Sequence, residues 1–498
     1  MNRNSSKFGP SYYRRIRTVL EPVLMVVAIF TAMFWFMNSS TTVSAASPIY
    51  VRQGGNDTLC NGTSDVDHGP GAPNCAFRTI QHGIDTVDIA GQVFVRAGTY
   101  DESVVLNRNV SVEVTADITI TGDLSIVTGF FIAPTGTLSL QGDFTRDNVA
   151  GFFNRNHGTV RFNGSSPQTV GGSAVLALDV VVIDNPSNVT LSYNLSFIGQ
   201  MQLLNGNLIL GSHNLELGAQ ATFTPPFSSS NMIITNGIGA VCKGYPNGLS
   251  SFPTSTFTFP IGESTGGNNY SPATIFFSSG IFGTSPTVCV RVVDAAVPAN
   301  FFPAYLTRHW VMSSENITNF SATVGFTYVD GGPSPDVVGT ESNLLALRLT
   351  GVNWDFGGPV NPATDTFSFA TTGLSIFTAG GSELNENILF ESFTTTPKIG
   401  GIQLDWATSF ENNLQGFNIY RATDPVRPLT PLNGSLIPAL SGGGTSTGGS
   451  YPYFDATASA GIQFYYWLGV LPEASAEDFF GPLSAIWFYN LNLPIVLN

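Results

Sequence analysis

The best candidate for a small-ion site in this chain is NDTLCNGTSDVDHG, residues 56–69. Asp57, Asp65 and Asp67 carry carboxylates of the kind that Ca²⁺ prefers, and Asn56 adds an amide oxygen. The EF-hand pattern is absent, and Asn and Asp also dominate ordinary turns because they bond their own main chain. The segment therefore predicts either a turn or a Ca²⁺ site, and Ca²⁺ is the only cofactor that the sequence suggests.

Catalytic carboxylates are harder to assign. A glycoside hydrolase needs two acids that flank the scissile bond, but no Asp-Asp pair occurs between residues 99 and 218. The acids there are Asp101, Glu102, Glu113, Asp117, Asp123, Asp143, Asp147, Asp179, Asp184 and Glu216. Arg155 and Arg161 could act as lyase bases only if carboxylates stack beside them. The sequence assigns no catalytic residue, and its five scattered histidines form no HExxH zinc motif.

The four cysteines are Cys60, Cys75, Cys242 and Cys289. They allow three disulfide connectivities, of which the local one, Cys60 with Cys75 and Cys242 with Cys289, keeps each bridge within one predicted domain. A structural zinc site needs closely spaced ligands such as CxxC, and the chain has none. We therefore expect disulfides, which are typical of an oxidising compartment.

Three aromatic residues, Trp354, Tyr451 and Tyr453, are candidates for stacking on sugar rings. Single aromatic residues in β-rich domains more often pack in the core or at an edge. Both interpretations stay open at the level of the sequence.

The composition limits the partners. Charged residues are only 11% of the chain, whose net charge is −15. Beyond residue 46 the chain keeps 14 basic and 33 acidic residues, and its only lysines are Lys243 and Lys398. Such a body is repelled by phosphate backbones and anionic lipid headgroups, so we expect no nucleic-acid partner. We expect contact with a membrane only through an uncleaved N-terminal segment.

Residues 1–46 predict export. A basic region that ends at Arg17 precedes the apolar run VLMVVAIFTAMFWFM, and Val43-Ser44-Ala45 offers small residues for a signal peptidase. The run is shorter than the roughly 20 residues of a membrane span. An uncleaved anchor is the alternative, because Val19 and Leu20 could lengthen the run. In either case the sequence predicts an extracellular or cell-surface location.

Residues 47–222 predict a solenoid. A short helical pattern in FRTIQHGIDTV leads into strand-like runs separated by Gly, Asn and Asp, with an apolar residue at every second position. YVRQGGND, FRTIQHGIDTV and VFVRAGTYDESVVL resemble the N-terminal cap and first coils of the pectin-lyase-like superfamily. The resemblance implies a right-handed parallel β-helix. It implies no activity, because the superfamily includes lyases, hydrolases, adhesins and plain stalks.

The rest of the chain predicts further β-domains. Longer strand candidates in residues 223–384 have β-sandwich spacing, and this segment resembles a β-rich module of large bacterial surface proteins. Residues 385–489, with GIQLDWATSFENNLQGFNIYRATD and YPYFDATASAGIQFYYWLGV, resemble a fibronectin type III domain. They depart from it at Phe464, where the family carries a tyrosine whose role Tyr465 or Tyr466 could take. Residues 490–498 form an apolar tail.

These observations predict an all-β chain: a right-handed parallel β-helix, a β-sandwich and a fibronectin type III-like sandwich. The expected function is that of a secreted or cell-surface, structural or adhesin-like protein, without catalysis. Its expected partner is a polysaccharide, a cell-envelope component or a protein. The alternative is a polysaccharide lyase or glycoside hydrolase that acts in a groove of the β-helix.

Overall fold

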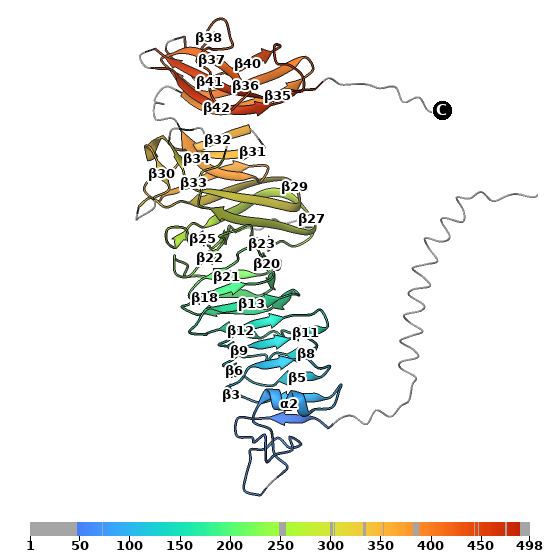
Figure 1. Ribbon diagram of the computed structural model, residues 1–498. Coiled ribbons are helices and arrows are strands. Elements are labelled where there is room, and N and C mark those ends of the chain that lie inside the picture. Colours follow the sequence, from blue (N-terminus) through green and yellow to red (C-terminus); the bar gives the residue numbers. More distant parts are fainter. Residues whose placement is uncertain are drawn as a thin grey trace, which may run out of the picture.

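The computed structural model describes the chain from residue 47 to residue 488 with short gaps. The described ranges are 47–71, 73–248, 255–298, 302, 304–331, 335–351, 353–381, 388–442, 444–446, 448–473 and 476–488. The predicted signal segment, 1–46, and the apolar tail, 490–498, lie outside them. Nearly all regular structure is β, and the coils and sheets stack into an elongated body (Figure 1). No helix among the described residues is long and apolar enough to cross a membrane.

The N-terminal part is a parallel β-solenoid with three faces, which confirms the predicted β-helix architecture. Face 1 begins with β1 (Ile49–Val51), β2 (Gln92–Val95), β5 (Ser111–Val114), β8 (Gly129–Ile132) and β11 (Gly151–Asn154). Its later coils contribute β14 (Leu176–Leu178), β17 (Leu195–Phe197), β20 (Leu215–Leu217) and β23 (Val241–Gly244).

Faces 2 and 3 are continuous ladders. Face 2 comprises β3 (Gly98–Tyr100), β6 (Ile118–Ile120), β9 (Thr137–Leu140), β12 (Thr159–Phe162), β15 (Val180–Asp184), β18 (Gln200–Asn205) and β21 (Thr222–Thr224). Face 3 comprises β4 (Val104–Leu106), β7 (Leu124–Ile126), β10 (Phe144–Arg146), β13 (Gln168–Gly172), β16 (Val189–Leu191), β19 (Leu208–Ile209), β22 (Ile233–Ile234), β25 (Ile261–Glu263) and the antiparallel β26 (Asn269–Tyr270).

Alternation of side chains builds the core. On face 1 the residues Val93, Val112, Phe131 and Phe153 occupy matching positions of successive coils and are all buried. The residue before each of them points to the opposite side of the sheet because side chains alternate along a strand. Each coil therefore buries its inner face only against its neighbours, as in other solenoids.

Side chains of Asn and Asp fix the register at the turns. Asp123 Oδ1 accepts a hydrogen bond from the backbone N–H of Asp143 in the next coil, at 2.8 Å. Asn207 Oδ1 likewise accepts from the N–H of Met232, at 2.9 Å. The Asn and Asp residues that separate the strands in the sequence thus supply acceptors for backbone donors that the ladders leave unpaired.

A short helix, α2 (Ile80–Thr86), packs against the first coils, as the sequence predicts. Thr79 caps its N-terminus, and Ile80 and Ile84 are fully buried. Glu102 accepts hydrogen bonds from the backbone N–H groups of Ile80 and Gln81. The helix covers the start of the solenoid, where the first strands would otherwise expose apolar side chains.

Parallel pairing continues past residue 222, the boundary expected from the sequence, to β25. The change to antiparallel pairing occurs at β23, which pairs with β20 on one side and with β27 on the other. The next strands are β24 (Phe257–Phe259), β27 (Ala273–Val293), β28 (Ala304–Leu306), β29 (His309–Thr327) and β30 (Val337–Val338). After the 3-10 turn η1 (Glu341–Asn343) come β31 (Leu345–Thr350), β32 (Asn353–Pro359), β33 (Thr366–Thr371) and β34 (Ile376–Gly381).

The C-terminal unit consists of two antiparallel sheets around a second core, which also includes Phe302, Leu347 and Trp354 of the preceding segment. One contains β35 (Ile388–Lys398), β36 (Gly401–Asn412), β39 (Thr445–Ser446) and β40 (Ser450–Asp455). The other contains β37 (Leu414–Ala422), β38 (Ile437–Pro438), β41 (Phe464–Pro472) and β42 (Asp478–Ala485). β35 also pairs with β32, which joins this unit to the preceding strands.

Candidate binding cleft

Face 1 of the solenoid is interrupted at one point. Its first ladder ends at β11, and a separate ladder begins at β14, one coil later. On the other two faces the same coils stay paired, β12 with β15 and β10 with β13. The edges of β11 and β14 that face each other therefore lack the strand partner that every neighbouring coil has.

A cleft of about 510 Å³ occupies this interruption. Its lining comes from β10 and β11, the turn after β11, and β14: Arg146, Phe152, Phe153, Asn154, Arg155, Asn156, His157, Val175, Leu176, Ala177 and Asp179. The volume lies within the range of roughly 300–1,000 Å³ typical of ligand pockets. We call this feature the wall cleft.

Arg146 spans one end of the wall cleft. Its Nε donates to the carbonyl of Gly151 and its Nη1 to the carbonyl of Val175, each at 2.6 Å. Among the described residues no carboxylate forms an ion pair with Arg146. The guanidinium thus links the chain on both sides of the cleft and keeps its positive charge unneutralised.

Asp179 spans the other end. Its Oδ1 lies 2.9 Å from Nε of Arg155, and its Oδ2 accepts from the backbone N–H of His157 at 2.8 Å. Asn156 and His157 have left-handed backbone conformations, with φ of 48° and 58°. This tight turn leaves the His157 side chain 91% exposed beside the cleft. Asp179 is the only acid in the lining, and both of its oxygens are engaged.

Two phenylalanines extend the cleft surface along face 1. Phe130 and Phe152 occupy the same position in successive coils, are 50% and 48% exposed, and have ring centroids 5.8 Å apart. Exposed Val149 and Val175 lie on either side of the interruption. Sequence reasoning missed the two rings, although each follows a glycine in a Phe-Phe pair, GFFI and GFFN. In a strand one member of such a pair must point outward.

The three predicted Ca²⁺ ligands lie in the N-terminal loops. Asp57 accepts from the N–H groups of Arg78 and Thr79 at the start of α2. Asp65 and Asp67 both pair with Arg52, at 3.1 and 2.9 Å. Burial opposes ionisation of Asp65, but hydrogen bonds from arginines outweigh it, so its pKa lies below the usual range. Protein donors engage all three carboxylates, and Ca²⁺ binding there stays a prediction.

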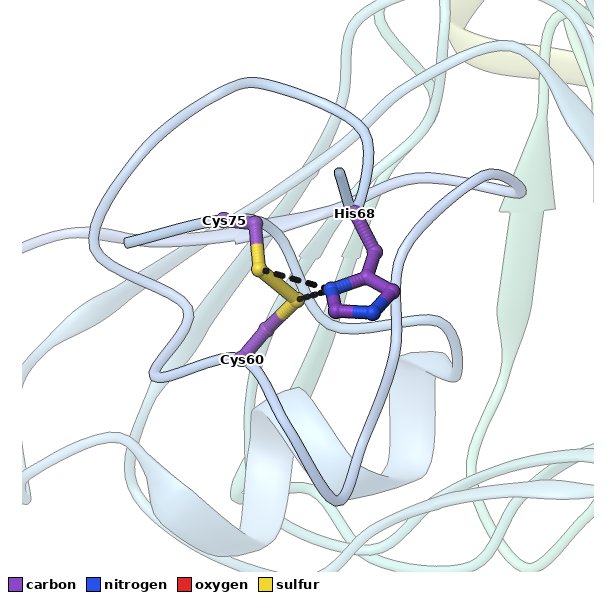
Figure 2. Close-up of side chains that lie close together, drawn as sticks. All are labelled: Cys60, His68 and Cys75. Carbon is purple, nitrogen blue, oxygen red and sulfur yellow. Dashed lines mark hydrogen bonds between the residues drawn. A yellow bond between two sulfur atoms is a disulfide. The ribbon is translucent and has the colours of Figure 1, made fainter. Parts of the chain in front are cut away.

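The cysteines pair locally, Cys60 with Cys75 and Cys242 with Cys289. Figure 2 shows the His68 ring beside the first bridge, with Nδ1 at 3.7 and 3.6 Å from the two sulfurs. These three side chains are close enough to hold a metal ion. Sulfurs bonded to each other cannot serve as thiolate ligands, however, so the bridged form is a structural clamp.

Two of the three aromatic residues proposed for ligand stacking are core residues. Trp354 is buried against Phe302. Tyr451 is buried in a parallel stack with Trp406, with ring centroids 5.3 Å apart. Neither ring can stack on an external sugar, because both side chains are buried. Tyr453 is half-buried at the edge of the same core.

The fold and the cleft define an elongated, disulfide-bonded β-solenoid protein with antiparallel β-units at its C-terminal end. No family model matches the chain, and no curated protein or solved structure is significantly similar to it. The structure confirms the parallel β-solenoid, whereas the pectin-lyase-like and fibronectin type III resemblances stay predictions. The geometry of the wall cleft is the basis for the functional argument.

Proposed function

We propose that this protein is a secreted or cell-surface, adhesin-like scaffold that binds its partner at the wall cleft and along the adjoining Phe130–Phe152 surface. The observation that carries the proposal is the interruption of an otherwise continuous solenoid wall. This interruption brings exposed phenylalanine rings, arginine guanidinium groups and unpaired strand edges together at one place. Such convergence of apolar area with a few polar groups is characteristic of binding sites.

The rest of the molecule fits this role. Stacked coils with a continuous core carry β11, which borders the cleft, at a distance from the strands of the C-terminal unit (Figure 1). Two disulfides are typical of proteins that work in an oxidising environment. A surface with few charges and an excess of acids favours contact with neutral or basic partners elsewhere on the rod, whereas the cleft itself carries two arginines and one acid.

A retention panel tests the proposal. The full-length exported protein is passed over immobilised polysaccharides, envelope fragments and peptides, and both retention and release of cleaved products are measured. We expect retention without cleavage, and a loss of about tenfold in the double variant F130S/F152S, equivalent to about 1.4 kcal/mol. The variant F454S removes an exposed phenylalanine of the C-terminal unit and serves as the matched control.

Two results would contradict the proposal. Retention that is unchanged in F130S/F152S would place the contact elsewhere. Release of shortened or unsaturated polysaccharide products by the wild-type protein would favour the alternative function, a lyase or hydrolase.

A further inference from the structure

We propose that the wall cleft receives one extended peptide segment of a protein partner, which pairs as an additional β-strand with the free edges of β11 and β14. This inference rests on the proposed function, since it names the class of partner that the cleft binds.

Two strand edges that lack a ladder partner border the wall cleft. The five-stranded ladder stops at β11, and the next ladder on this face starts at β14, so two edges border one cleft. A strand edge presents a row of N–H and C=O groups and is a template for another chain. Peptides that add to such an edge gain affinity from main-chain hydrogen bonds. A peptide that enters this cleft meets two such edges with which it can pair.

The ends of the cleft set its length. Arg146 bonds the carbonyls of Gly151 and Val175 at one end, and Asp179 bonds Arg155 and the His157 N–H at the other. Between these ends β11 has four residues and β14 has three. An inserted strand of similar length would span roughly 10–13 Å at about 3.3 Å per residue. The cleft therefore suits a short extended segment rather than a folded surface.

The side chains of β11 and β14 that line the cleft, and the charge of the lining, indicate the composition of the peptide. Phe153 and Leu176 line the cleft from strand positions that face the core, whereas Phe152 and Ala177 occupy outward positions. A paired strand would place alternate side chains toward these two environments. The lining carries two arginines against one aspartate in a chain whose net charge is −15. A segment that combines an apolar residue with an acidic one matches both features.

A glycan explains these features less well. Its hydroxyl groups could bond single guanidinium groups and stack on Phe152. They do not reproduce the alternation of donors and acceptors that two facing strand edges present. Glycan binding is therefore the competing outcome of the test.

The test uses short random-sequence peptides displayed against the full-length protein, with the polysaccharide panel in parallel. The variant A177W fills the mouth of the cleft. S196W is its matched control, because Ser196 is the register partner of Ala177 in the intact ladder between β14 and β17 and is also half-buried. Equal unfolding transitions of the two variants establish that both are folded.

We expect acidic-apolar peptides to be retained by the wild-type protein and by S196W, and to bind A177W about tenfold more weakly. Methylation of alternate backbone nitrogens in a selected peptide should weaken binding by about tenfold, because it removes ladder donors and leaves the side chains intact. Amide hydrogen exchange should slow in residues 152–154 and 176–178 when the peptide binds.

Any other result contradicts strand addition, the proposed function or both. Equal binding of the N-methylated peptide, or equal binding by A177W and S196W, would overturn strand addition. Retention of a polysaccharide but of no peptide, with loss in A177W, would overturn it and leave the proposed function standing. Retention of neither class would contradict both.

Discussion

The solenoid and the C-terminal unit are both β-structures with buried cores, but different contacts hold them together. In the solenoid each coil contacts the next, and backbone donors at the turns are satisfied by an Asn or Asp about one coil away, as with Asp123 and Asp143. In the C-terminal unit, buried polar groups from distant strands meet. Asp455 accepts from Arg421 and from the Tyr466 hydroxyl, both at 2.7 Å. Stability is thus distributed along the first region and concentrated at a few points in the second.

The largest expected effect tests the solenoid core. Phe131 is fully buried, and its neighbour Phe130 is half-exposed on the opposite side of the same strand. We expect Phe131→Ala to lower the free energy of unfolding by about 3–5 kcal/mol, because it leaves a cavity between coils. Phe130→Ala should lower it by less than about 0.5 kcal/mol. Denaturant unfolding followed by circular dichroism measures both, and equal losses would contradict the assignment of inward and outward faces.

The second effect tests the buried network of the C-terminal unit. Asp455→Asn removes the charge that Arg421 faces, and we expect a loss of about 2–3 kcal/mol, in the range for hydrogen bonds to charged groups. Asp405→Asn, on an exposed position of the adjoining strand β36, should have almost no effect. Fluorescence-detected unfolding provides the measurement. If both variants lose a similar free energy of unfolding, the buried network around Asp455 contributes no more to stability than an exposed position does.

A smaller effect is expected at the turns between coils. Asn207 is buried and accepts from the Met232 N–H, so Asn207→Ala leaves that donor unpaired. We expect a loss of about 1–2 kcal/mol. The exposed Asn205, two residues earlier, provides the control, and hydrogen exchange of Met232 locates the change. Unchanged protection of that amide would show that the side chain does not fix the register.

The smallest effect concerns pH at the junction of the two architectures. Burial lowers the pKa of Lys243 to about 8, and its ammonium group donates to the carbonyls of Gly218 and Ala219. Above that pH the unfolded chain binds more protons than the folded chain, so stability rises with pH. We expect a gain of about 1 kcal/mol between pH 7 and pH 9.

Lys243→Met should abolish this gain while leaving the fold intact. The comparison requires unfolding curves at both pH values for the wild-type protein and the variant. A gain that persists in the variant would assign the pH dependence to another group.

The helix over residues 80–86 and the solenoid follow from local patterns. Apolar residues at helical spacing, followed by alternation with Asn, Asp and Gly at the turns, leave few other ways to bury the apolar face. The end of the solenoid was less predictable. The strand sequences up to β25 are similar in pattern to those of the strands that follow. Whether two strands pair in parallel or antiparallel depends on the path of the chain between them, which the strand sequences do not show. Of the two tyrosines that follow Phe464, Tyr466 donates a buried hydroxyl hydrogen bond, to Asp455.

The sequence by itself determined an all-β chain and the spacing of its coils, because strand periodicity and turn residues act over a few neighbouring positions. Only the tertiary structure decided that β11 and β14 separate, that Trp354 and Tyr451 are internal, and that Phe130 and Phe152 face solvent side by side. Each of these depends on which coil or strand comes to lie next to another. The whole packed chain selects that neighbour. The local pattern of GFFI and GFFN indicates that one ring of each pair points outward, but not which ring or beside which other ring it lies.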